Sequence, residues 1–218
     1  MVRTTRDNTA PVCIEKRYSE FEKLNATLKK YFPAVMSDVH FPRKQFSGNF
    51  SAKTIAERSR AFEQYLSQLI MNPQVRMSDL FAPFFYGTEW SKACELFRSD
   101  NYPAAILILR RVLDLQRKLL ADAHSNTVRT LSLLAVCYMK CCNDVQSYLS
   151  SRLAIKSIHT NDRSEYLLPL LEYSIRLAWT LGYEKQDLEE RLKSLKKGPN
   201  DQPHSLEDIV VRHIQGAV

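Results

Sequence analysis

The stretch APVCIEKRYSEFEKLNATLKKY, residues 10–31, changes its hydrophobic pattern in the middle. Residues 10–18 place β-forming side chains at near-alternate positions, which predicts a strand. From Ser19, a residue type that often caps helices, apolar residues recur at helical spacing, which predicts an amphipathic helix to about residue 31. The apolar residues of this predicted helix are Phe21, Leu24 and Leu28. The sequence therefore predicts a strand-to-helix junction.

Farther along the chain, helices are the only regular elements that the pattern predicts. The segment from Pro33 to about residue 51 contains proline and glycine without a sustained period, which is typical of a loop. A second helix is predicted from about residue 51 or 54 to residue 70, and the chain after Gly87 reads as nearly continuous helical hairpins. Those later helices are predicted at 88–99, 103–120, 126–140, 145–157, 164–181, 185–195 and 205–214. The expected fold class is mainly α, with one residual strand (α+β).

The charge of the chain is unevenly distributed. It carries 31 Lys and Arg against 24 Asp and Glu, a net charge of +7. Residues 1–87 hold 13 of these cations and 8 of the anions, whereas residues 88–218 hold 18 and 16. A basic excess favours partners with dense negative charge, such as nucleic acid or an anionic bilayer. No apolar stretch approaches the ~20 residues that span a bilayer, so we expect any membrane contact to be peripheral.

Basic and aromatic residues recur in a spaced order within the first 87 residues. Arg17 and Tyr18 lie at the strand-to-helix junction, the loop carries Arg43 and Lys44, and the second helix carries Arg58. A phosphorylated inositol is bound by such a set, because guanidinium groups grip phosphate in a bidentate way, an ammonium adds a point charge and a flat ring stacks on the sugar. Taken singly, each of these motifs is more typical of a solvated surface.

The joint order of these motifs resembles the PX (phox-homology) domain of the sorting nexins. The text EKRYSEFEKL, FPRKQFSGNF and ERSRAFEQYL is similar to the subgroup in which a PX domain precedes a helical, tetratricopeptide-like PX-associated B domain. The resemblance implies a PX unit over residues 1–87 that lacks its first two strands, and a protein-interaction domain over residues 88–218. It implies a cytoplasmic adaptor, peripheral on the early endosome membrane, that serves protein transport.

The resemblance also implies a role for individual residues, with phosphatidylinositol 3-phosphate as the ligand. Arg17 is expected to contact the 3-phosphate and Tyr18 to stack beneath the ring. Lys44 is expected to reach the 1-phosphate and Arg58 to bond the ring hydroxyls. Candidate membrane contacts are Arg43, Phe46 and Phe50, although packing under the loop is an equally open reading for the two phenylalanines.

Other functions receive less support from the sequence. It has no catalytic motif, no cofactor or metal signature and only five glycines, so neither an enzyme nor a backbone phosphate loop is expected. A nucleic-acid binder would need a continuous basic stripe, which the nearly balanced residues 88–218 do not predict. A helical scaffold for cargo or adaptor proteins without a lipid site remains the main alternative. Trp90 and Trp179 are read as core residues rather than as groove anchors.

Overall fold

The computed structural model describes residues 14–43, 52–120, 124–158, 164–195 and 205–215. The chain forms two compact units, and the long helix α5 (Pro83–Arg98) contributes to both. The first unit comprises residues 1–87 with 118–120, and the second comprises residues 88–117 with 121–218.

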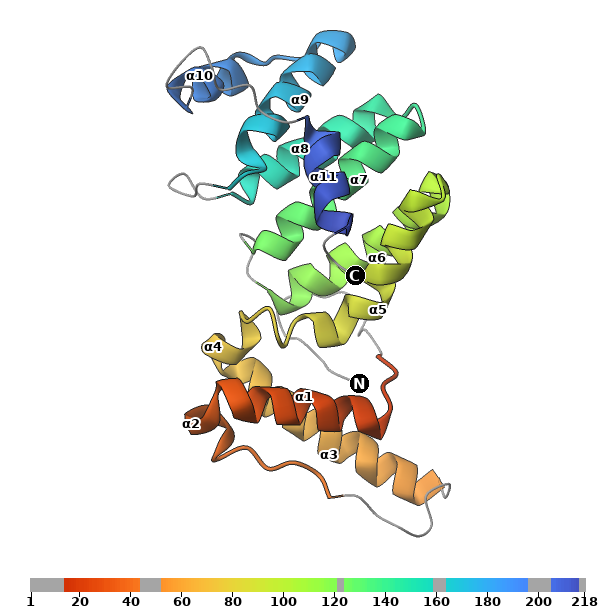
Figure 1. The fold of residues 1–218 in the computed structure, drawn as a ribbon, viewed down its shortest axis with the longest axis vertical. Coiled ribbons are helices and arrows are strands. Elements are labelled where there is room, and N and C mark those ends of the chain that lie inside the picture. The colour runs from red at the N-terminus through yellow and green to blue at the C-terminus, as the bar shows by residue number, and fades with distance from the viewer. Residues whose placement is uncertain (1–13, 44–51, 121–123, 159–163, 196–204, 216–218) are drawn as a thin grey trace. The chain divides into compact units, whose positions relative to one another are not determined.

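The first unit is built from helices (Figure 1), and aromatic rings pack between them. Its helices are α1 (Tyr18–Tyr31), α2 (Pro33–Met36), α3 (Ala52–Met71), α4 (Pro73–Arg76) and the first turn of α5. The ring of Phe21 on α1 stacks on Phe62 of α3 with a centroid distance of 3.9 Å, and Phe84 lies 5.0 Å from Phe21. Stacked and edge-on aromatic contacts stabilise such a core beyond the area that they bury.

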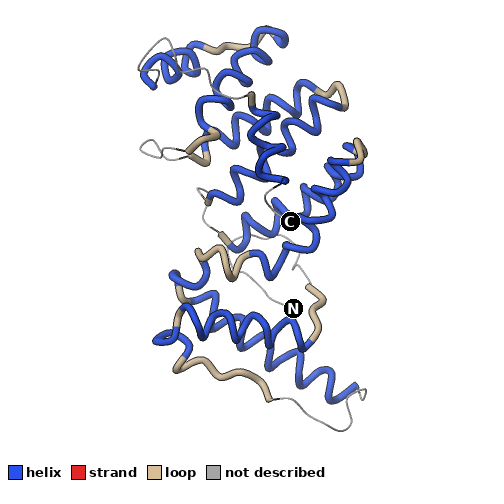
Figure 2. Tube along the Cα trace, viewed as in Figure 1, coloured by secondary structure: helices blue, strands red, loops and turns tan. Residues whose placement is uncertain are grey.

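The strand predicted at residues 10–18 is not found among the described residues. Residues 14–17 have no regular structure, and Tyr18 is already the first residue of α1 (Figure 2). The backbone of Arg17 is extended, with φ −77° and ψ 154°. An extended segment becomes a strand only when a neighbouring strand pairs with it, and none is described here. Residues 10–13 of the predicted strand lie outside the described residues. The mainly helical part of the fold prediction is confirmed.

The start of α1 also corrects the predicted N-cap, which is Arg17 rather than Ser19. The Glu20 carboxylate accepts a hydrogen bond from the Arg17 backbone N–H at 2.7 Å. This bond, followed by the charge of Lys16, holds the pKa of Glu20 below its ordinary value. A carboxylate in the first turn also favours the helix dipole, so the helix begins before the serine.

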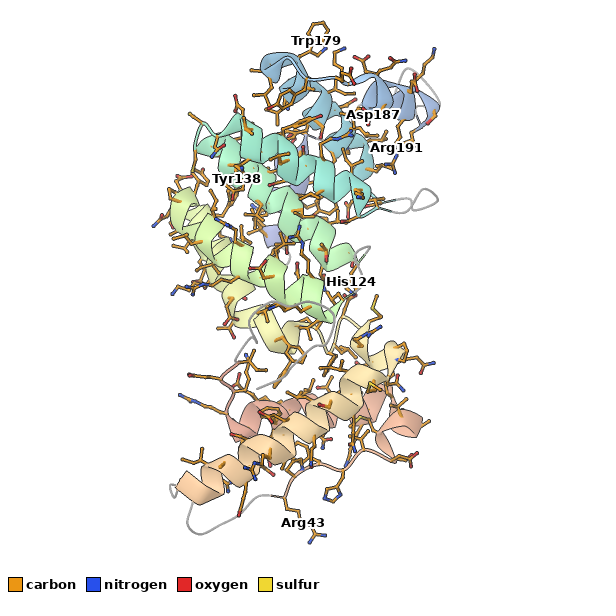
Figure 3. All side chains as sticks on the ribbon, turned by 180° about the vertical axis from the view of Figure 1, so that it is seen from behind. Arg43, His124, Tyr138, Trp179, Asp187 and Arg191 are labelled. Carbon is orange, nitrogen blue, oxygen red and sulfur yellow. The ribbon has the colours of Figure 1, made fainter. Side chains whose placement is uncertain are left out.

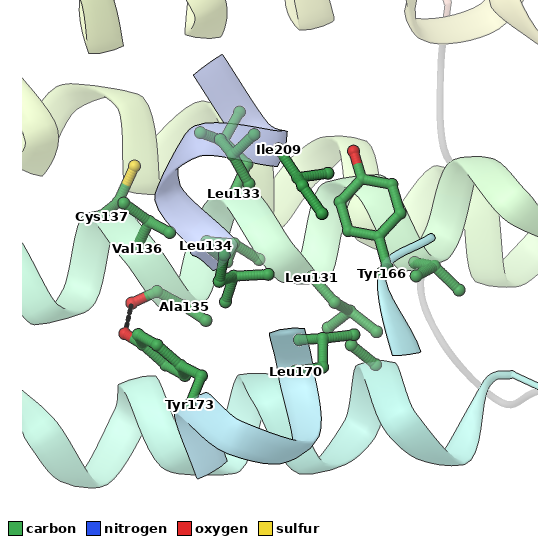
Figure 4. Packing of buried hydrophobic residues seen from close by; sticks show 14 of the residues in the cluster. Leu131, Leu133, Leu134, Ala135, Val136, Cys137, Tyr166, Leu170, Tyr173 and Ile209 are labelled. Carbon is green, nitrogen blue, oxygen red and sulfur yellow. Dashed lines mark hydrogen bonds between the residues drawn. The ribbon is translucent and has the colours of Figure 1, made fainter. Parts of the chain in front are cut away.

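The second unit consists of helices whose bounds lie close to the predicted ones. After the shared α5 come α6 (Tyr102–Leu119), α7 (Ser125–Lys140), α8 (Asp144–Lys156), α9 (Leu167–Leu181), α10 (Gln186–Leu195) and α11 (Leu206–Gln215). Helix α7 is buried at ten positions, including an unbroken run from Thr130 to Cys137. Figure 4 shows side chains of α7, α9 and α11 packed together. An all-round buried helix of this kind forms the centre of a core.

Hydroxyl groups connect three helices inside this core. The Tyr173 hydroxyl on α9 donates to the carbonyl of Ala135 on α7 at 3.1 Å (Figure 4). Ser147 on α8 donates to the same carbonyl at 2.8 Å and lies 2.6 Å from the Tyr173 hydroxyl. Burial raises the pKa of Tyr173 to about 12. The bonds satisfy polar groups that would otherwise be costly to bury.

Trp179 corrects the reading of both tryptophans as core residues. Trp90 is half-buried and packs against the core, but Trp179 is 70% exposed. Its ring lies at the end of α9, just before the left-handed turn at Gly182 (φ 70°), and the Lys185 ammonium lies 4.2 Å from its centroid. Figure 3 shows the side chain pointing away from the helices. The helical period that suggested burial ends at this turn.

Candidate functional site

A hollow of about 250 Å³ opens in the first unit between the start of α1 and helix α3. Tyr18 and Arg58, two of the predicted lipid-binding residues, both line it, together with the cation Lys16. Its other walls are mostly apolar and include Ile55 and Phe62. We call it the Tyr18–Arg58 hollow. A pocket of this kind, apolar with a few charged groups, is the usual form of a small-ligand site.

The position of Tyr18 is fixed on several sides. Its hydroxyl donates to the carbonyl of Pro42 at 3.1 Å, across 24 residues of sequence. Its ring meets Phe41 and Phe62 edge-on, with centroid distances of 5.8 and 5.7 Å. Burial, and then the charge of Glu22, raise the pKa of Tyr18 above its ordinary value, whereas the nearby Arg58 guanidinium lowers it. The ring is therefore held in one place beside a cation.

Arg58 also lines a second hollow, of about 400 Å³, on the side of the loop before α3. Pro42 and Arg43 line this second hollow as well, and so does the carboxylate residue Glu57. Arg43 is exposed, and Figure 3 shows its side chain at the outer edge of the loop. Among the described residues, Arg58 is the one residue that lines both hollows.

The remaining predicted residues have different outcomes. Arg17 is exposed and lines neither hollow. Lys44, Phe46 and Phe50 lie outside the described residues, so their predicted roles stay predictions. Tyr18 and Arg58 are the two predicted residues that the structure brings together in one hollow.

Sequence reasoning missed Lys16. This side chain lines the Tyr18–Arg58 hollow, lies 3.4 Å from the Glu20 carboxylate and points over the Phe84 ring at 5.5 Å. The sequence carried a signal for this residue, because Ile14, Lys16 and Tyr18 are spaced by two. An extended chain directs every second side chain to the same side.

The described residues show neither a metal site nor a membrane span. No group of three or more His, Cys, Asp and Glu among them is placed to hold a metal ion. No helix within the same residues has the length and apolar character that crossing a bilayer requires.

Comparison with known proteins places these features in a family. The sequence matches the PX domain over residues 4–87. It is 33% identical to sorting nexin-20 of Rattus norvegicus over 97% of this chain and 68% of that protein. It is 32% identical to sorting nexin-21 of Mus musculus over 94% of this chain and 57% of that protein. No solved structure matches at a significant level.

The relatives differ in how much of this chain they match. Sorting nexin-15 of Homo sapiens is 31% identical over only 42% of this chain, whereas the two relatives above match nearly all of it. Residues beyond the PX match therefore also have counterparts in sorting nexins. This chain belongs to the sorting nexins, the PX-domain family of membrane-associated trafficking adaptors.

Proposed function

We propose that this chain is a non-enzymatic adaptor that binds phosphatidylinositol 3-phosphate on the early endosome membrane and carries protein partners there. Its PX domain implies recognition of phosphoinositide lipids in general. The observation that carries the proposal is that Tyr18 and Arg58, 40 residues apart in sequence, line one hollow. The first unit supplies the lipid site, and residues 88–218 form a PX-associated B domain that binds cargo or adaptor proteins.

The chemistry of the hollow supports an inositol headgroup. The fixed ring of Tyr18 offers a flat apolar surface to the sugar, and the Arg58 guanidinium offers forked donors to its 4- and 5-hydroxyls. Lys16 adds a second cation to the same wall. Arg17 completes the proposal as the contact for the 3-phosphate and Lys44 as the contact for the 1-phosphate, while Arg43, Phe46 and Phe50 meet the bilayer surface.

Liposome co-sedimentation with a matched pair of variants tests the role of Arg58. Arg58→Gln removes the guanidinium from both hollows, whereas Arg60→Gln removes an exposed guanidinium from the same helix that lines neither. Because a hydrogen bond to a charged group contributes about 1.5–3 kcal/mol, Arg58→Gln is expected to weaken binding to phosphatidylinositol 3-phosphate about 10- to 100-fold. Arg60→Gln is expected to change it little. Equal binding by the two variants would overturn the site.

The role of Arg17 needs its own comparison, because this residue lines neither hollow. Arg17→Ala is compared with Lys23→Ala, which removes an exposed cation from α1. A selective loss of binding with Arg17→Ala supports the 3-phosphate contact. If both variants bind as the parent does, Arg17 is not a ligand, whatever Arg58 contributes.

The choice of lipid is tested with vesicles that carry phosphatidylinositol 3-phosphate, its positional isomers or phosphatidylserine, each at two salt concentrations. Selective binding that survives moderate salt supports a fitted headgroup site. Binding to every anionic vesicle that disappears in salt indicates only a basic surface, because salt screens exposed charges. Absence of binding to all vesicles would favour the alternative of a helical scaffold without a lipid site.

A further inference from the structure

Helix α6 presents a charged stripe on its exposed face. Residues Leu107, Arg110, Arg111, Asp114 and Arg117 are exposed, and each lies three or four positions from another member of the set, so they share one side of the helix. The opposite side is buried and carries Ala105, Leu109, Val112 and Leu113. We call the exposed set the α6 stripe. It concentrates three guanidinium groups on one helix of a unit whose charge is nearly balanced over its sequence.

The charges of the α6 stripe have no partners within the described residues. Among these residues, the three arginines and Asp114 form no ion pair and no side-chain hydrogen bond. Three other arginines of the second unit are engaged. Arg98 donates to the carbonyl of Ile214 at 2.5 Å, Arg152 pairs with Asp187 at 2.7 Å and Arg212 lies 3.9 Å from Glu165. The α6 stripe therefore differs from these engaged arginines in the availability of its guanidinium groups.

The order of residues in the stripe restricts the kind of partner. Asp114 lies between Arg110 and Arg117 in sequence and shares their face. A uniformly anionic surface, such as a bilayer or a nucleic-acid backbone, would meet repulsion at this carboxylate. A polypeptide can place a cation against Asp114 and carboxylates against the arginines. Leu107, which is 66% exposed, adds an apolar contact at the N-terminal end of the stripe.

We propose that the α6 stripe is a docking surface for an acidic helical segment of a partner protein. This rests on the proposed function of residues 88–218 as the protein-binding half. Arg110 and Arg117 are seven residues apart, so they are separated by about 10 Å along the helix axis at ~1.5 Å per residue. Two carboxylates seven residues apart on a partner helix match that separation. Between them the partner presents one lysine or arginine to Asp114, and beyond them an apolar residue to Leu107.

Synthetic peptides provide the probe. A fluorescein-labelled helical peptide carries Leu, Glu, Glu, Lys and Glu at the spacing of the stripe, and a second carries the same residues in reverse order for antiparallel docking. Scrambled peptides of identical composition are the controls. Fluorescence anisotropy with the full chain is expected to show binding of one ordered peptide about tenfold tighter than its scrambled form, as charge patterning gives specificity. Equal binding of ordered and scrambled peptides would overturn the proposal.

Two sets of variants locate the contact. The triple change Arg110→Gln, Arg111→Gln, Arg117→Gln is expected to abolish the preference for the ordered peptide. The triple change Lys92→Gln, Lys156→Gln, Lys193→Gln removes three exposed cations elsewhere in the second unit and is expected to retain it. The ordered peptide places a Lys against Asp114. The variant Asp114→Lys is therefore expected to prefer a peptide in which this Lys is replaced by Glu. If Asp114→Lys strengthens the binding of all acidic peptides equally, the stripe lacks the proposed register.

The same variants separate this proposal from the lipid function. Co-sedimentation with phosphatidylinositol 3-phosphate is expected to be unchanged by the arginine triple, because the stripe belongs to the second unit. If the parent chain binds the lipid but shows no preference for an ordered peptide, the docking surface is overturned and the lipid site stays intact. If the arginine triple instead abolishes binding to phosphatidylserine vesicles while peptides do not discriminate, the stripe meets a membrane, and the peptide proposal is wrong.

Discussion

Two tyrosines, one in each unit, make the same kind of hydrogen bond, from the hydroxyl to a backbone carbonyl, in different surroundings. Tyr18 donates its hydroxyl to the Pro42 carbonyl beside an open hollow, whereas Tyr173 donates to the Ala135 carbonyl inside a closed core. The first bond holds a half-buried ring next to a cation, and the second satisfies polar groups that water does not reach. The difference suggests that enclosed polar groups serve stability, while half-exposed ones are available for binding. The variants below test this division.

The largest expected effect comes from the enclosed core. Leu170→Ala removes a side chain of α9 that is 0% exposed, and it is expected to lower the free energy of unfolding of the second unit by about 2–5 kcal/mol. Urea denaturation followed by tryptophan fluorescence measures this unit alone, because Trp90 and Trp179 both belong to it. Leu149→Ala, at a position that is 46% exposed, is the control and is expected to cost far less. Similar losses would show that the core is not closely packed.

Alkaline pH is expected to destabilise the second unit, because its core also buries thiol and phenol groups that can ionise. Burial raises the pKa of Cys94 to about 11 and of Cys137 and Tyr173 to about 12. Groups with raised pKa values keep their protons in the folded state, whereas the unfolded chain releases them from about pH 9 or 10. These groups therefore contribute their full stabilisation below about pH 9. The free energy of unfolding then falls as the pH rises to about 12, by up to about 1.4 kcal/mol per group and pH unit.

Stability measured by urea at several pH values between 8 and 11 checks this expectation. Tyr173→Phe is the matched variant, since it removes one of the groups whose pKa is raised and should flatten the decline. A decline of the same steepness in parent and variant would mean that Tyr173 is not protected by the fold. Thiol labelling gives an independent comparison, with exposed Cys142 expected to react well before the buried Cys137.

The elements of this fold were largely predictable, because each long helix carries its own hydrophobic period. Leu24 and Leu28 are buried as their spacing predicts. The strand at residues 10–18 was wrong, since local β propensity does not supply a pairing partner. Such pairing is a property of the whole chain rather than of the segment.

The candidate site was less predictable, because it depends on contacts between distant residues. Tyr18 and Arg58 could be named from their motifs, but the Tyr18 bond to Pro42 depends on the path of the loop. Lys16 could have been found from its alternation with Tyr18. The difference between Trp90 and Trp179 could not be read from helical spacing, because the exposure of Trp179 follows from its place beside the turn at Gly182.

A smaller effect is expected from the two tyrosine hydroxyls. Tyr173→Phe leaves the buried Ser147 hydroxyl without one neighbour and is expected to cost the second unit about 1–2 kcal/mol at neutral pH. Tyr18→Phe exposes the Pro42 carbonyl to water, which replaces the lost bond, so the first unit is expected to lose about 0.5 kcal/mol or less. Hydrogen exchange resolves the two units separately. An equal cost for both variants would contradict the division between enclosed and half-exposed groups.

The smallest effect is expected where the second unit meets solvent. Lys185→Ala removes the ammonium over the Trp179 ring, and an exposed cation–π contact contributes about 0.5–1 kcal/mol. The ion pair of Lys185 with Glu189 adds little, because both side chains reach solvent. Stability is therefore expected to fall by less than about 1 kcal/mol, while acrylamide quenches the uncovered tryptophan more strongly. Lys193→Ala, an exposed cation on α10, should leave quenching unchanged. If Lys185→Ala instead destabilises the unit as much as Leu170→Ala does, Trp179 belongs to the packed core despite its exposure.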